Sequence, residues 1–143
     1  MIKKKISKIF VPLDGSENSV RGLETAITLA RNCGATITGF YSIYAPPHSE
    51  FKGIGSVGKA FNREIKKFMK EAKTMSAENG IVFTDKIARG EVGYNIIKAS
   101  NGKAKYDMIV MGSRGRSNTK EIFFGSVSNY VIHTSKIPVV IVK

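Results

Sequence analysis

The stretch that decides the fold reads Met108-Ile109-Val110-Met111-Gly112-Ser113-Arg114-Gly115, an apolar run that passes directly into a glycine-containing loop. An apolar run of this length without polar alternation is typical of a strand that is buried on both faces of a parallel sheet. Gly125 follows after nine more residues, and a helical pattern with Val127 and Val131 comes next. The stretch therefore predicts a strand, a loop and a helix in that order.

The same alternation of strand and helix runs through the whole chain. Apolar, β-branched runs predict strands over residues 8–13, 35–44, 81–88, 107–111 and 138–142. The gaps between them carry apolar residues three or four apart, at 20–30, 61–75, 92–99 and 123–134, and we interpret these stripes as core faces of helices. The order predicts one α/β domain over residues 1–143, with a doubly wound, Rossmann-like parallel sheet and helices on both faces.

The formal net charge of +12 is the unusual feature of the composition. It favours an anionic partner without choosing among nucleotide, nucleic acid, anionic lipid and acidic protein. Many cations fall on one predicted helix, at Arg63, Lys66, Lys67, Lys70 and Lys73. Because Glu64 and Glu71 interrupt them, we interpret this face as solvated and keep nucleic-acid binding only as an alternative.

One cysteine, no signal-peptide pattern and no apolar run of membrane-spanning length favour a cytoplasmic protein without a membrane partner.

A second glycine-rich segment competes for the role of anion-binding loop. Residues 53–60, Gly-Ile-Gly-Ser-Val-Gly-Lys-Ala, satisfy G-x-G-x-x-G and nearly complete a P-loop, but Ala60 stands where Ser or Thr would ligate Mg²⁺. Both motifs require glycines that leave a strand directly, whereas residues 45–52, with Pro46 and Pro47, intervene here. We therefore interpret the segment as a flexible loop.

The loop that follows the strand at 107–111 offers several groups suited to an anion. Gly112 and Gly115 allow the backbone to approach a ligand closely. The residues after Gly125 offer backbone N–H groups at a helix N-terminus, where the helix dipole favours negative charge. The alternative is an ordinary strand–loop–helix turn with Ser126 as the helix N-cap. The spacing alone leaves both interpretations open.

This loop resembles the nucleotide signature of the universal stress protein family, G-x₂-G-x₉-G-[ST], at Gly112, Gly115, Gly125 and Ser126. The resemblance continues through residues 137–142 (Ile-Pro-Val-Val-Ile-Val) and through residues 8–17 (Lys-Ile-Phe-Val-Pro-Leu-Asp-Gly-Ser-Glu). It implies a strand order of 3-2-1-4-5 and an ATP-binding regulatory or stress-response module. Because the sequence shows no positioned base and no pair of Mg²⁺-ligating carboxylates, we expect at most slow hydrolysis. A slow ATP hydrolase is the enzymatic alternative.

The implied strand order places Asp14, after the first strand, opposite Gly112 at the switch point of the sheet. The resemblance implies that Asp14 contacts the ribose or a metal-bound water, with capping of the first helix as its alternative role, and that Pro12 and Ser42 lie beside the adenine. Arg114 stands where many relatives carry histidine. The full implied set is Pro12, Asp14, Ser42, Met111, Gly112, Ser113, Arg114, Gly115, Arg116, Ser117, Asn118, Gly125, Ser126, Val127 and Ser128.

The implied cofactor is ATP, with Mg²⁺ held mainly by the phosphates, and we assign no catalytic residue and no metal-ligating side chain.

The run at 138–142 would be an edge strand in this order. Exposed apolar edges recruit other strands. We therefore expect a homodimer in which two fifth strands pair antiparallel about a twofold axis, as is common in the family. The alternative is a monomer whose last helix shields the edge.

Overall fold

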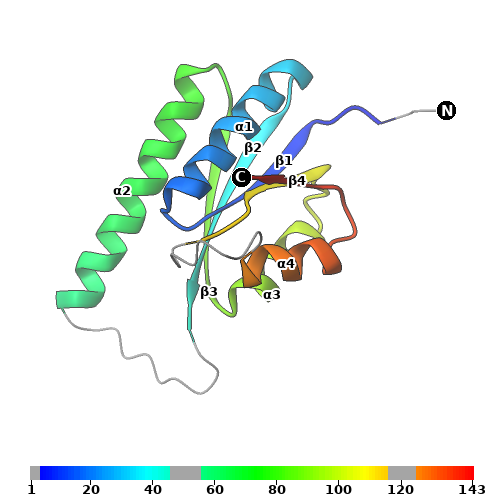
Figure 1. Ribbon diagram of the computed structural model, residues 1–143. Helices are drawn as coiled ribbons and strands as arrows, with labels where there is room; N and C mark the ends of the chain where they lie inside the picture. The colour runs from blue at the N-terminus through cyan, green and yellow to red at the C-terminus, as the bar shows by residue number, and fades with distance from the viewer. Residues whose placement is uncertain (1–3, 46–55, 116–124) are drawn as a thin grey trace.

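The computed structural model describes residues 4–45, 56–115 and 125–143. They build a five-stranded parallel sheet in the order β3-β2-β1-β4-β5 (Figure 1). The strands are β1 (Lys8–Leu13), β2 (Thr36–Tyr44), β3 (Phe83–Gly90), β4 (Met108–Gly112) and β5 (Val139–Val142). The fold class and the strand order that the sequence predicts are confirmed.

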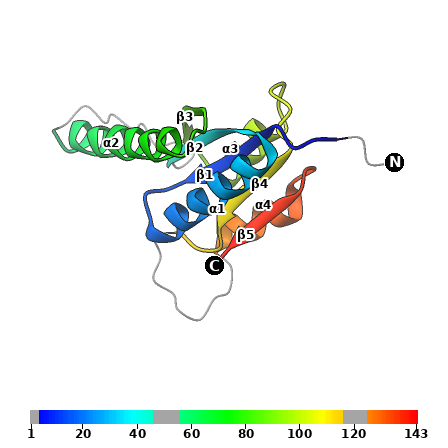
Figure 2. The same cartoon turned by 90° about the horizontal axis from the view of Figure 1, so that it is seen from above.

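In the described ranges, four helices connect the strands and cover both faces of the sheet. They are α1 (Glu17–Cys33), α2 (Ser56–Glu78), α3 (Val92–Ser100) and α4 (Ser126–Thr134). Side chains of α1 and α2 share one apolar cluster with one face of the sheet, and side chains of α3 and α4 share a second cluster with the other face. Figure 2 shows α1 and α3 on opposite sides of β1. Within the described ranges, no helix has the length and apolar character that a bilayer crossing requires.

The central strands are buried on both faces, as their uninterrupted apolar sequences predict. Ile9 and Val11 belong to the cluster under α1 and α2, while Phe10 between them faces α3 and α4. This alternation follows from the period of two along a strand. The ring of Phe10 packs against Phe40 and Tyr106, with ring centroids 5.1 and 4.9 Å apart.

The outer elements are more exposed than their sequences predict. All four residues of β5 are only half-buried, because β5 lies at one edge of the sheet. On α4, the sequence assigns Tyr130 and Thr134 to the core, but both are exposed. Among the described residues of that stripe, Val131 alone is fully buried.

The competing glycine segment is partly helical, which corrects its interpretation as a flexible loop. Gly58, Lys59 and Ala60 lie inside α2. Its first glycines, Gly53 and Gly55, lie outside the described residues. Since β2 ends at residue 44, the segment does not follow a strand directly.

A buried carboxylate ties the start of β1 to the start of β4. The Asp107 carboxylate accepts hydrogen bonds from the Ser7 N–H at 2.8 Å, the Ser7 hydroxyl at 3.0 Å and the Lys8 N–H at 2.9 Å. The Lys4 ammonium lies 2.9 Å from its other oxygen. Burial alone would raise the pKa of Asp107, but these hydrogen bonds outweigh burial and hold the pKa well below its usual value.

We expect Asp107→Asn to destabilise the protein by about 1–3 kcal/mol at pH 7, because the hydrogen bonds to the charged carboxylate are lost. A carboxyl whose pKa is lowered by folding stabilises the protein above its unfolded pKa of about 3.9, and this contribution is lost as the pH falls below that value. Urea unfolding at pH 7 and pH 3 should therefore show a smaller difference between wild type and variant at pH 3. The exposed Asp85 supplies the control, Asp85→Asn. An equal difference at both pH values would contradict the prediction.

Candidate functional site

A pocket of about 260 Å³ opens at the carboxyl edge of the sheet. It lies between the ends of β1 and β4, where the chain order of the strands reverses. Ligands of doubly wound sheets bind at such a switch point. Its walls come from β1, β2, α3, β4, α4 and the loop after β4.

The pocket brings together most of the residues that the sequence assigns to the site. Those that line it are Pro12, Asp14, Ser42, Met111, Gly112, Arg114, Gly115, Gly125, Ser126, Val127 and Ser128. Ser113 is buried next to the pocket and is not part of its lining. Arg116, Ser117 and Asn118 lie outside the described residues.

Five lining residues are missing from the sequence assignment: Leu13, Ser19, Phe40, Val92 and Ile96. The sequence could have indicated that Val92 and Ile96 line the pocket. They stand one turn apart at the start of the helix that follows the third strand, so they reach the same edge of the sheet as the glycine loop. Leu13 and Phe40 look like core strand residues in sequence, and nothing marks them as lining a pocket.

The N-terminus of α4 is one wall of the pocket, and no side chain in the described part of the chain caps it. Gly125 is the N-cap residue and has no side chain that could accept a hydrogen bond. By contrast, the Ser16 hydroxyl caps α1 by accepting from the Ser19 N–H at 3.1 Å. The alternative in which Ser126 caps α4 is therefore wrong. The first N–H groups of α4 and the helix dipole suit an anion in the pocket.

The beginning of the loop is held by hydrogen bonds to other parts of the chain. The Ser113 N–H donates to the Val142 carbonyl at 2.8 Å, and the Ser113 carbonyl accepts from the Gly125 N–H at 2.7 Å. The buried Ser128 hydroxyl also donates to the Ser113 carbonyl, at 2.7 Å. Ser128 therefore holds the two ends of the loop together, and its hydroxyl is engaged by the protein.

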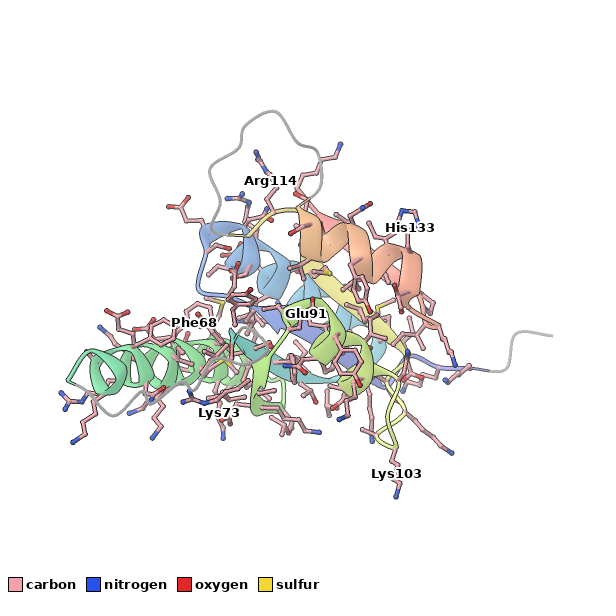
Figure 3. The ribbon with its side chains drawn as sticks, turned by 90° about the horizontal axis from the view of Figure 1, so that it is seen from below. Phe68, Lys73, Glu91, Lys103, Arg114 and His133 are labelled. Atoms are coloured by element: carbon pink, nitrogen blue, oxygen red, sulfur yellow. The ribbon has the colours of Figure 1, made fainter. Side chains whose placement is uncertain are left out.

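Asn18 of α1 fixes the next residue of the loop. Its side-chain oxygen accepts from the Arg114 N–H at 2.7 Å, and its side-chain nitrogen donates to the Val142 carbonyl at 3.3 Å. The backbone N–H groups of Ser113 and Arg114 thus both have protein partners. Among the described residues, the groups that remain for an anion are the Arg114 side chain, which lies between α1 and α4 (Figure 3), and the backbone around Gly115 and the start of α4.

The glycines of the signature have different structural roles. A Cβ at Gly112 would lie 2.3 Å from the Asn18 side-chain oxygen and 2.7 Å from the Asn18 carbonyl oxygen. Gly112 therefore permits α1 to pack against β4. A Cβ at Gly125 would meet its nearest atoms at 3.5 Å, an ordinary contact. Gly125 lines the pocket, and a side chain there would meet no close contact.

Asp14 faces the glycine loop from the end of β1. A Cβ at Gly115 would lie 2.7 Å from one Asp14 carboxylate oxygen, and the other oxygen accepts from the Ser16 N–H at 2.9 Å. The Tyr41 hydroxyl donates to the Asp14 carbonyl at 3.0 Å. The alternative role of Asp14, capping α1, is filled by Ser16 instead.

The other end of the pocket is apolar and has one hydrogen-bonded hydroxyl. Phe40, Val92 and Ile96 line it together with Pro12. The Ser42 hydroxyl accepts from the Asn95 amide at 3.1 Å. An apolar wall with a few placed polar groups is typical of small-molecule sites. The pocket thus combines a surface for a flat ring with a surface for an anion.

Comparison with known proteins identifies the family. The profile of the Universal stress protein family matches residues 5–143. Universal stress protein MJ0531 of Methanocaldococcus jannaschii is 31% identical over 142 residues, which cover 95% of this chain and 81% of the relative.

Solved structures of the family have the same fold. Universal stress protein UspA from Lactobacillus plantarum superposes with a TM-score of 0.88 at 19% identity, covering 99% of this chain and 100% of that chain. The universal stress protein from Archaeoglobus fulgidus in complex with dAMP gives a TM-score of 0.70 at 21% identity, covering 98% and 100%. The profile match over nearly the whole length shows that this chain belongs to the universal stress protein family.

Proposed function

We propose that this protein is a cytoplasmic ATP-binding regulatory module whose ATP-bound and empty states differ in shape or in choice of partner. The observation that carries the proposal is the pocket itself, which runs from an apolar wall to the N-terminus of α4, where no described side chain forms a cap. The first surface suits a purine ring and the second suits phosphates.

The proposed arrangement places the adenine against Phe40, Val92 and Ile96, with Ser42 at its edge. The ribose lies near Asp14, and the phosphates lie between Gly115 and the first turn of α4. Arg114 pairs with phosphate oxygens, and Mg²⁺ is held mainly by the phosphates. The dAMP complex of the Archaeoglobus fulgidus protein supports this proposal, because a relative with this fold holds an adenine nucleotide.

Binding rather than turnover is the proposed activity, and a slow ATP hydrolase is the enzymatic alternative. Among the described lining residues, Asp14 is the sole carboxylate, and the Ser16 N–H already holds one of its oxygens. Efficient phosphoryl transfer uses side chains that hold Mg²⁺ and a further group that positions the nucleophile. One carboxylate does not supply both.

The test is thermal unfolding with and without Mg-ATP. We expect a dissociation constant on the order of 1 μM. At a hundredfold excess over that value, ATP should stabilise the fold by about 2.7 kcal/mol. The melting temperature should then rise by about 5–10 °C. Mass spectrometry of the denatured protein would identify any nucleotide carried through purification. No shift with millimolar ATP, ADP or AMP would overturn the proposal.

We also propose that the protein forms a homodimer through β5. The strand is an edge, and its four apolar residues are half-buried. Ile141→Lys should convert the dimer to monomer, because the twofold axis brings two like charges together, and light scattering at micromolar concentration measures this. Ile87→Lys on the opposite edge strand is the matched control, since Ile87 is exposed. A monomeric wild type would contradict the proposal.

A further inference from the structure

The outer face of α2 carries a row of five cations. Lys59, Arg63, Lys66, Lys70 and Lys73 are spaced four, three, four and three residues apart, and all five are exposed. At 3.6 residues per turn, they lie within an arc of about 80° and extend over about 21 Å of the helix. Figures 1 and 2 place α2 at the margin of the molecule beside β3. We call these five residues the α2 row.

Acidic side chains do not neutralise the α2 row. In sequence Glu64 and Glu71 interrupt the cations, but on the helix they point about 80–100° away from the nearest member of the row. No aspartate or glutamate stands three or four residues from any of the five cations. Nor does any ion pair in the described part of the chain include a member of the row.

Neighbouring cations of the row stand three or four residues apart, and like charges at this spacing destabilise a helix. The row therefore carries positive charge that is not compensated along its own face of the helix, which favours an anionic partner.

A neighbouring strand adds a further cation beside the row. The Arg89 guanidinium of β3 donates to the side-chain oxygen of Asn62 on α2 at 3.4 Å. Asn62 precedes Arg63 and borders the row on the helix surface. None of these residues lines the nucleotide pocket. The row is therefore a surface separate from that pocket.

The apolar face of α2 is used by the core, which bears on the kind of anionic partner. Ile65, Met69 and Ala72 are buried, and the ring of Phe68 packs edge-on against Tyr41 with centroids 6.3 Å apart. Helices that bind membrane surfaces insert their apolar face into the lipid. Because the apolar face of α2 is buried in the core, the helix could interact with a membrane surface only through its charged side chains. A nucleic-acid backbone requires nothing more than charge.

We propose that the α2 row is a binding surface for the phosphate backbone of nucleic acid, without sequence preference. The cations pair with successive phosphates and release the counterions condensed on them, which is the main source of non-specific affinity. This function is independent of the nucleotide pocket, so the failure of either proposal leaves the other standing.

The experiment measures binding of wild-type protein to a random-sequence DNA duplex over a range of salt concentrations. The logarithm of the binding constant should fall against the logarithm of salt with a slope of about −4 to −5, which corresponds to about five phosphate contacts. Lys66→Gln/Lys70→Gln should reduce the magnitude of the slope by about 1.8. The matched control is Lys103→Gln/Lys136→Gln, which removes the same charge from two exposed lysines outside α2.

The control should keep the wild-type slope, and both variants should keep a melting temperature close to that of the wild type without any ligand. The melting temperature shows that the row variant is folded, whether or not the pocket binds ATP. An equal loss in both variants would overturn the proposal, because net charge would then explain the binding. Two further results would also overturn the proposal. One is that the protein does not bind DNA at low salt, and the other is that it binds anionic phosphatidylserine vesicles but not DNA.

Discussion

Gly125→Val is expected to abolish stabilisation by ATP while the protein remains folded. The backbone at Gly125 has φ −72° and ψ 166°, an extended conformation that valine adopts readily. Its Cβ would meet only ordinary contacts, the nearest at 3.5 Å. Replacing the N-cap glycine should cost the fold about 1 kcal/mol. The branched side chain would occupy the phosphate end of the proposed site, so the melting shift of several degrees should disappear.

The control for this variant is Gly58→Val. Gly58 belongs to the competing glycine segment and lies inside α2, where a valine should be tolerated and the ATP shift retained. Isothermal titration of both variants with Mg-ATP would give the affinities directly. Loss of binding in Gly58→Val with retention in Gly125→Val would show that the nucleotide lies at the other segment.

Gly112→Ala is expected to destabilise the protein by about 3 kcal/mol, although it adds only one methyl group. The added carbon would lie 2.3 Å from the Asn18 side-chain oxygen and 2.7 Å from the Asn18 carbonyl oxygen, so α1 or β4 must move. The melting temperature should fall by about 10 °C. Chemical denaturation measures the loss, and Gly125→Ala, with its nearest contact at 3.5 Å, should lose less than about 1 kcal/mol. Equal stability of the two alanine variants would contradict this division of roles.

The sequence predicts the centre of this fold better than its margins. The runs in β1 and β4 are buried on both faces, so hydrophobicity alone locates them. The run in β5 is just as apolar, yet its residues are half-buried, because burial there depends on the strand's place at the edge and not on its composition. The exposure of Tyr130 on α4 also depends on its neighbours in the fold. Its ring lies across Gly93 of α3 and is only partly covered.

The sequence also predicts the candidate site only in part. The strand–loop–helix pattern and the family resemblance locate the loop after β4, because the carboxyl ends of parallel strands meet at one edge. The roles of individual residues depend on contacts between distant segments. Both glycines line the pocket, and nothing in the sequence shows that Gly112 is packed against Asn18 whereas Gly125 has room for a side chain. Asn18 itself lies almost a hundred residues from the loop that it holds.

The hydrogen bonds around Ser113 and Arg114 have a consequence for the thermodynamics of ligand capture. Their backbone N–H groups and the Ser113 carbonyl are all bonded to other segments of the chain. This part of the loop therefore has its conformation before any ligand arrives, and the entropy of ordering it is lost during folding. A ligand that binds here keeps a larger share of its interaction energy as affinity, because preorganisation lowers the cost of association.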